Sequence, residues 1–145
     1  MKRFCGIIIV VFIIGILSIP LVNDWTAKKV ARDLLDLPTP ENTVVVDSVS
    51  RAGKLTGNGN GMQYFGAILV ESELSSDELD TFYKQFRNHE WDCIVVSQKQ
   101  PQLDFLEYND ELRFCKYDQE EGNFFIIYSW GNGVSPFNML DIRGH

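Results

Sequence analysis

The sequence predicts an α+β fold: an N-terminal transmembrane helix, then a compact domain with a mostly antiparallel sheet of about five strands and two helices on one face. Three observations lead to this expectation. Residues 4–22 form a long uncharged apolar run. Two later segments carry apolar residues at helical spacing, and the remaining apolar segments are short and separated by Gly, Asn and Pro.

The apolar run has the length of a membrane span. Its 19 residues, at about 1.5 Å each, make a helix of roughly 28 Å, close to the hydrocarbon thickness of a bilayer. Lys2 and Arg3 before the run predict a cytoplasmic N-terminus, a bias that Lys28 and Lys29 weaken. Residues 1–23 are therefore predicted to be a transmembrane anchor.

A cleaved signal peptide is the alternative for this segment. Signal peptides have a shorter apolar run, about 7–15 residues, that ends in a small-x-small site. The run here is longer, and no pair of small residues has the required spacing after Ser18. Cys5 precedes the run, so it cannot be a lipoprotein cysteine. We expect an uncleaved anchor, with secretion after cleavage as the alternative.

Charge and composition limit the function of the remainder. From Asn23 onward there are 11 basic and 20 acidic residues, a net charge of −9, and no Lys/Arg cluster provides a phosphate footprint. This balance excludes a nucleic-acid binder, and the 45% hydrophobic content excludes disorder. Residues 24–145 are predicted to form one extracytoplasmic α+β domain.

The domain is expected to begin with a helix and a hairpin. Asn23 or Asp24 can cap a helix through about Leu35, and Pro38 and Pro40 end it. Strands are predicted at residues 43–55 and 62–72. Gly and Asn at residues 57–61 tolerate the positive φ of a hairpin connection.

The second strand of this hairpin has apolar residues on both faces, which predicts an interior strand. One face carries Tyr64, Ile68 and Val70, and the other carries Phe65, Ala67 and Leu69.

The second helix has the clearest local signature. Ser75 and Glu78 form a capping box, and Leu74 and Leu79 occupy the positions of a hydrophobic staple. The expected core stripe consists of Leu79, Phe82, Tyr83 and Phe86. The helix is predicted to end at residues 88–90.

Three further strands complete the predicted sheet. The first covers residues 91–96, and a polar break at 98–102 follows it. Strands at 112–117 and 123–130, joined by the acidic turn 118–122, are expected to form a second hairpin.

A resemblance accompanies this pattern. Residues 37–91 contain Leu-Pro-x-Pro, a Gly-Asn-Gly-Asn-Gly hairpin and a Leu-Ser-Ser-Asp-Glu-Leu helix start. In these motifs the chain is similar to small uncharacterised bacterial single-pass envelope proteins with no assigned function. The resemblance implies a location and a fold, but no chemistry.

The glycine-rich turn is the first candidate for chemistry. A P-loop needs Lys-Ser/Thr after its glycines and a helix directly behind them, whereas Lys54 precedes most of the glycines and a strand follows. A hairpin turn is the favoured interpretation, with a small anion nest as the alternative.

Cysteine and histidine offer little for catalysis. Cys93 and Cys115 lie on predicted strands, where a disulfide and two separate thiols are both compatible with the sequence. His89 precedes Cys93 by four residues, but a histidine near a helix C-terminus fits the helix dipole better than a Cys–His pair. His145 is the last residue.

The carboxylates are scattered. Asp118, Glu120 and Glu121 lack the order of a calcium loop and are expected to form a solvated turn. A charged loop is the expectation for a second group, Asp104, Glu107, Asp110 and Glu111. The apolar residues 137–142 are expected to pack on the sheet or, alternatively, to dock another protein.

These observations predict a membrane-anchored binding or assembly module of unknown ligand, with no cofactor, no metal site and no assignable catalytic residue. Its expected partners are the membrane, which the N-terminal helix would cross, and another protein, which would bind at the sheet edge or at residues 137–142. The alternatives are a small cell-envelope hydrolase that uses carboxylates, or an accessory subunit of a membrane complex. A hydrolase should have a deep pocket with two or more acidic groups, and a binding module an exposed groove or a free sheet edge.

Overall fold

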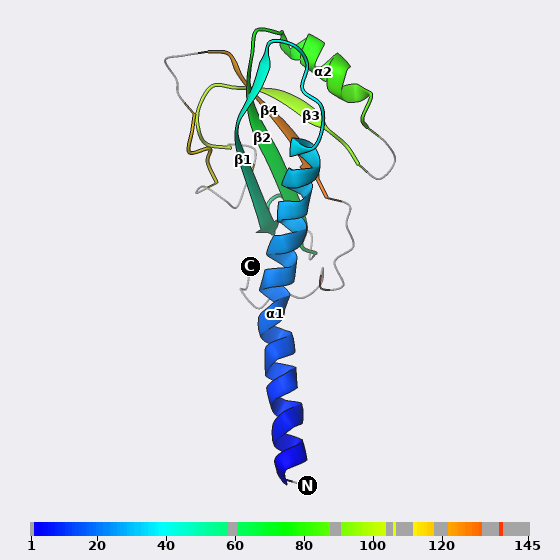
Figure 1. Ribbon diagram of the computed structural model, residues 1–145. Coiled ribbons are helices and arrows are strands. Elements are labelled where there is room, and N and C mark those ends of the chain that lie inside the picture. The colour runs from blue at the N-terminus through cyan, green and yellow to red at the C-terminus, as the bar shows by residue number, and fades with distance from the viewer. Residues whose placement is uncertain are drawn as a thin grey trace.

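A computed structural model describes residues 2–57, 61–87, 91–103, 106, 112–117, 122–131 and 137, with side chains from Gly6 onward. The order is α1 (Lys2–Leu35), β1 (Thr43–Gly53), β2 (Gln63–Ser72), α2 (Ser76–Lys84), β3 (Ile94–Gln98) and β4 (Phe124–Trp130). The strands form one antiparallel sheet in the order β1-β2-β4-β3, and the N-terminal half of α1 projects away from it (Figure 1). The α+β class, the apolar N-terminal helix and the antiparallel sheet are thus confirmed.

The first hairpin and its interior strand are confirmed. β1 pairs with β2 from Thr43↔Ser72 to Gly53↔Gln63, with a β-bulge between Val45 and Asp47. β2 lies between β1 and β4, which pair with its two edges. Each face of β2 also packs against a separate hydrophobic cluster, which explains why its consecutive residues are apolar.

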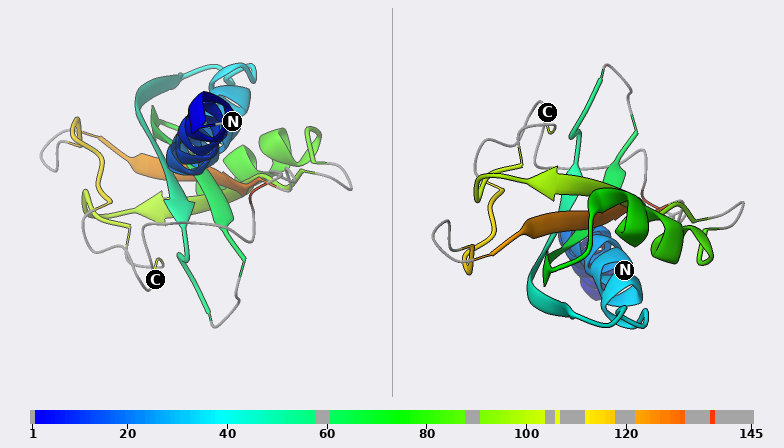
Figure 2. Two further views of the ribbon diagram at one scale, coloured as in Figure 1. Left: turned by 90° about the horizontal axis from the view of Figure 1, so that it is seen from below. Right: turned by 90° about the horizontal axis from the view of Figure 1, so that it is seen from above.

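The sheet separates two hydrophobic clusters. The helix-side cluster joins Leu34 of α1 and Leu79 and Tyr83 of α2 to the sheet, and its other buried members are Ile68, Val70, Cys93, Phe125 and Ile127. The loop-side cluster lies on the opposite face of β2 and β4. Its buried members are Leu55, Phe65, Ala67, Leu69, Leu103, Leu106, Phe114, Phe124 and Ile126. Figure 2 shows α1 crossing one side of the sheet.

The predicted helix start at Asn23 or Asp24 is wrong. α1 is continuous from Lys2 to Leu35, with Pro20 inside it. A cap is needed only where a helix begins, because the preceding turns otherwise accept the backbone N–H groups. Asn23 is instead fully buried, and its side chain accepts a hydrogen bond from the Tyr64 hydroxyl at 2.9 Å.

The second helix starts as predicted and ends early. Ser75 is the N-cap, the Glu78 N–H donates to the Ser75 hydroxyl, and the Glu78 carboxylate accepts from the Ser75 N–H at 2.8 Å. The helix ends at Lys84, before residues 88–90. Phe86 therefore packs against the helix-side cluster from the following turn.

The predicted strand at residues 112–117, and with it the second hairpin, is wrong. Arg113 forms only an isolated bridge with Gln102. The N–H groups of Cys115 and Lys116 donate to the Asp47 carboxylate at 2.7 and 3.0 Å, so they are unavailable to a strand ladder. Phe114 covers the loop-side cluster. The sheet has four strands in the described part of the chain, not about five, and β4 pairs with β2 and β3.

Candidate functional site

The junction between α1 and the sheet is the first feature of functional interest. The α1 backbone passes directly over Gly66 of β2. A Cβ atom at Gly66 would lie 2.8 Å from the Val30 carbonyl carbon and 2.9 Å from Ala31 Cα, which is too close for any side chain. Glycine at this position lets the helix lie on the sheet without a side-chain layer between them.

A buried polar contact lies closer to the N-terminus at the same junction. Tyr64 of β2 is buried beside Ala27 and Val30 of α1, and its hydroxyl donates to Asn23. Each group satisfies the other where water has no access. The contact sets the angular position of α1 on the sheet, because only one rotation of the helix presents Asn23 to Tyr64.

The preceding part of α1, from Gly6 to Ser18, contains no buried residue. Its large apolar side chains are exposed, among them Ile9 (58%), Phe12 (67%) and Leu17 (59%). The helix from Gly6 to Leu35 is long and apolar enough to cross a membrane, a criterion that signal sequences near the N-terminus also meet. Burial begins at Ile19.

Two hollows lie between α1 and the edge strand β1. The larger, about 390 Å³, is open and is lined by Trp25, Lys28, Ala31, Arg32, Leu35, Ser48, Val49 and Ser50. The smaller, about 210 Å³, is lined by Asp24, Ala27, Lys28, Ser50, Arg51 and Ala52. Lys28 and Ser50 line both, so we treat them as one α1–β1 groove. The Arg32 guanidinium lies 6.0 Å from the centre of the Trp25 ring.

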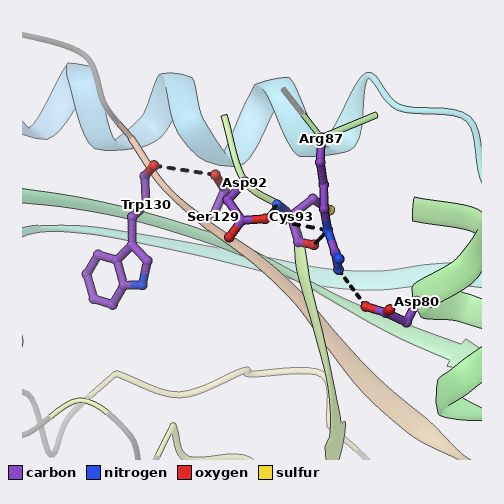
Figure 3. Close-up of polar contacts among 6 residues, drawn as sticks. All are labelled: Asp80, Arg87, Asp92, Cys93, Ser129 and Trp130. Atoms are coloured by element: carbon purple, nitrogen blue, oxygen red, sulfur yellow. Dashed lines mark hydrogen bonds and ion pairs between the residues drawn. The ribbon is translucent and has the colours of Figure 1, made fainter. Parts of the chain in front are cut away.

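A second polar cluster joins the end of α2 to the start of β3 (Figure 3). The Arg87 guanidinium pairs with Asp80 at 2.5 Å and with Asp92 at 3.5 Å, and its Nε donates to the Cys93 carbonyl. Asp92 also accepts from the Cys93 N–H at 2.9 Å. All three of these partners of the Arg87 guanidinium belong to the protein itself, so this cluster stabilises the connection from α2 to β3.

Cys93 is chemically protected. Its side chain is fully buried in the helix-side cluster, and burial raises the pKa of the thiol to about 12, although the nearby Arg87 charge acts in the opposite direction. Burial, followed by the charge of Cys93, raises the pKa of the neighbouring Tyr83 hydroxyl to about 12. A thiol that stays protonated is a poor nucleophile and metal ligand.

Cys93 and Cys115 are both free thiols. Cys93 belongs to the helix-side cluster, whereas Cys115 is exposed and follows Phe114 of the loop-side cluster. The sheet separates them, so the disulfide that the sequence left open does not form in this fold.

Several predicted features lie outside the described residues. They are most of the 57–61 turn, His89, residues Asp104, Glu107, Asp110 and Glu111, the acidic turn at 118–121, nearly all of the 137–142 segment, and His145. At the start of the turn Gly57 has φ +66°, the positive value expected of a hairpin connection. The anion nest therefore stays an untested alternative.

The described residues contain no group of three or more His, Cys, Asp or Glu side chains that could hold a metal ion. The α1–β1 groove includes one carboxylate, Asp24. Neither of these two hollows combines two acidic groups, which is the arrangement that a carboxylate hydrolase needs.

The α1–β1 groove was missed from the sequence. Lys28 and Arg51 are far apart along the chain, and only the packing of α1 across β1 brings them to one hollow. The available signal was Trp25 with Lys28 and Arg32 at helical spacing, which marks one helix face but not its partner.

No family model, curated protein or solved structure matches this chain.

Proposed function

We propose that the chain is a single-pass membrane protein with a cytoplasmic N-terminus, whose domain outside the membrane is a non-enzymatic binding or assembly module. The observation that carries the proposal is the continuity of α1. One unbroken helix has an exposed apolar half and a half buried in the domain core. Asn23 then marks where the helix leaves the bilayer, not where a new element begins.

The exposed half needs an apolar environment. Burying one large aliphatic or aromatic side chain is worth about 1.5–3 kcal/mol. Ile7 to Ile14 alone present eight such exposed side chains without interruption. In water this surface would drive aggregation, whereas a bilayer covers it on all sides of the helix.

Retention of the anchor is supported by the use that the domain makes of α1. Ile19, Asn23 and Ala27 are all buried against other parts of the fold. Cleavage near these residues would remove the partner of the Tyr64 hydroxyl and expose the cluster around it. The alternative of a secreted product would therefore lose part of its own core.

A binding or assembly role is supported by two surfaces of the domain. The α1–β1 groove is open and has a mixed polar and apolar lining, and among the described strands β3 forms the sheet edge opposite β1. Grooves and free strand edges are the common sites of peptide and ligand recognition. The envelope location that the resemblance over residues 37–91 implies agrees with this role.

Membrane retention of the full chain tests the proposal. After extraction of membranes with alkaline carbonate, the intact mass should include residues 1–30. Protease added outside intact spheroplasts should digest the domain. A mass that lacks the first 20 to 30 residues, or a domain protected from the protease, would contradict it.

A matched pair of variants sharpens this experiment. Ile13→Arg places a charge in the exposed apolar half and should release the chain into the carbonate supernatant. Val44→Arg places the same charge on an exposed position of β1 and should leave retention unchanged.

A further inference from the structure

The basic residues of this acidic protein are unevenly distributed. Residues 23–32 and 50–56 together carry five basic residues and one acidic residue. The basic residues are Lys28, Lys29, Arg32, Arg51 and Lys54. The remainder from residue 33 to 49 and from 57 onward carries 6 basic and 19 acidic residues. The two basic segments meet where α1 packs across the end of β1.

Three of these cations line the α1–β1 groove. Lys28 and Arg51 line its smaller hollow, and Lys28 and Arg32 line the larger one with the hydroxyls of Ser48 and Ser50. Among the described residues, ion pairs are formed by Arg87 and not by Lys28, Arg32 or Arg51. Asp24 is the one carboxylate of the lining, so the groove keeps a net positive charge.

The smaller hollow, which α1 lines from Asp24 to Lys28, begins at the depth of the lipid headgroups when α1 spans the bilayer. Lys28 follows Val22 by six residues, about 9 Å along the helix, and a headgroup layer is roughly 5–8 Å thick. The Cα–Cβ bonds of a helix tilt toward its N-terminus, so the long Lys28 side chain can reach back to that layer. Trp25, which is exposed, then lies in the interfacial aromatic belt.

We propose that the α1–β1 groove binds the phosphate of an anionic phospholipid headgroup, with Lys28 as its direct contact and Arg51, which lines the smaller hollow from the edge strand, adding positive charge beside it. Arg32 and the two serine hydroxyls extend the site away from the membrane. The ligand chemistry is a phosphate diester that carries acyl chains, because the apolar part of α1 next to the groove continues into the bilayer. This inference rests on the proposed membrane anchoring.

Lipid binding to the full chain in neutral detergent tests the inference. Phosphatidylglycerol and phosphatidylcholine with the same acyl chains are titrated separately, and bound lipid is counted by native mass spectrometry. The wild-type chain should bind phosphatidylglycerol more tightly. Each of Lys28→Gln and Arg51→Gln should weaken this binding about fivefold, and the double variant about 25-fold. Equal binding of the two lipids, or an unchanged double variant, would overturn the inference.

Two further measurements separate the possible causes. The double variant Lys84→Gln/Lys116→Gln removes the same charge from α2 and from the loop after Phe114, and it should bind phosphatidylglycerol like the wild type. Excess inorganic phosphate should not displace the lipid, and full displacement would indicate a free-phosphate site instead. Carbonate extraction of the Lys28→Gln/Arg51→Gln variant should still leave it in the membrane, so loss of lipid preference and loss of anchoring are distinguishable.

Discussion

The Tyr64 hydroxyl donates a hydrogen bond to the Asn23 side chain at 2.9 Å, and both residues are buried. Asn23 is the first residue after the apolar run, and Tyr64 lies in the strand at the centre of the sheet. The contact therefore connects the end of the proposed membrane span to the middle of the domain. No flexible linker separates the two, so the domain is held in one orientation relative to α1.

Removal of the Tyr64 hydroxyl should destabilise the domain. Tyr64→Phe keeps the ring but takes away the hydrogen bond to buried Asn23, and we expect a loss of about 1–3 kcal/mol in the free energy of unfolding. Denaturant unfolding of the full chain in detergent, followed by tryptophan fluorescence, measures it. Tyr117→Phe, which deletes a hydroxyl from a half-buried ring in the loop-side cluster, is the control. Equal effects of the two changes would mean that the Asn23 contact contributes nothing specific.

Gly66→Ala should displace α1 from the sheet. The added methyl group would overlap the backbone at Val30 and Ala31, which cannot move aside without breaking helix contacts. Overpacking of this kind costs about 1–3 kcal/mol or more. Gly15→Ala adds the same methyl group where nothing lies within 4 Å, so its unfolding midpoint should match that of the wild type. A Gly66→Ala protein as stable as the Gly15→Ala protein would show that α1 does not lie against β2.

Ser75→Ala should cost about 0.5–2 kcal/mol through loss of the N-cap. Ser76→Ala changes the next residue, the first of α2, and should have little effect. Hydrogen bonds from the backbone and then the hydroxyl of Ser75 lower the pKa of Glu78. Their contribution is present above the ordinary pKa of 4.5 and is lost as the pH falls through the folded value. The penalty of Ser75→Ala should therefore shrink in acid, and a penalty independent of pH would argue against the capping box.

Alkaline pH should weaken the domain through Cys93 and Tyr83. Their pKa values are raised from 9.0 and 10.0 to about 12 each, so the folded state holds protons that the unfolded state releases. Stability is full below pH 9 and falls as the pH rises from 9 to 12. Cys93→Ala should flatten this decline, whereas Cys115→Ala should not. Unfolding midpoints across this pH range provide the measurement, and identical profiles for the two variants would refute the assignment.

The two thiols of the domain should differ in reactivity. In a Cys5→Ser background, an alkylating reagent should modify exposed Cys115 rapidly and leave buried Cys93 unmodified until the domain unfolds. Peptide mass mapping before and after denaturation provides the measurement. Equal labelling in the native state, or a disulfide between the two cysteines, would contradict the placement on opposite faces of the sheet.

Local signals were sufficient for some elements. The capping box at Ser75 and Glu78 was predictable because its contacts span three residues. The interior position of β2 followed from apolar residues on both faces, a property that burial on two sides requires. The first hairpin was predictable because turn residues directly separate its strands.

Other elements depended on distant partners. Residues 112–117 have a strand-like pattern, but the Asp47 carboxylate accepts two of their N–H groups from a bulge in β1. Asn23 has the chemistry of a helix cap, yet Tyr64 uses its side chain inside the core. In both cases a side chain that is distant in sequence forms the hydrogen bond, where local sequence patterns predict a strand ladder or a helix cap.

The sequence by itself determined that this protein carries a membrane-length apolar helix and an antiparallel α+β domain, because length, periodicity and turn chemistry are properties of short segments. Tertiary structure decided how the helix and the domain are joined and which side chains line the α1–β1 groove at their junction. The sequence contains no Lys/Arg cluster that would provide a phosphate footprint, and Lys28 and Arg51 are far apart along it. Packing of α1 over Gly66 and across β1 brings these two cations to one groove. Electrostatic attraction depends on distance in space, which only the folded chain defines.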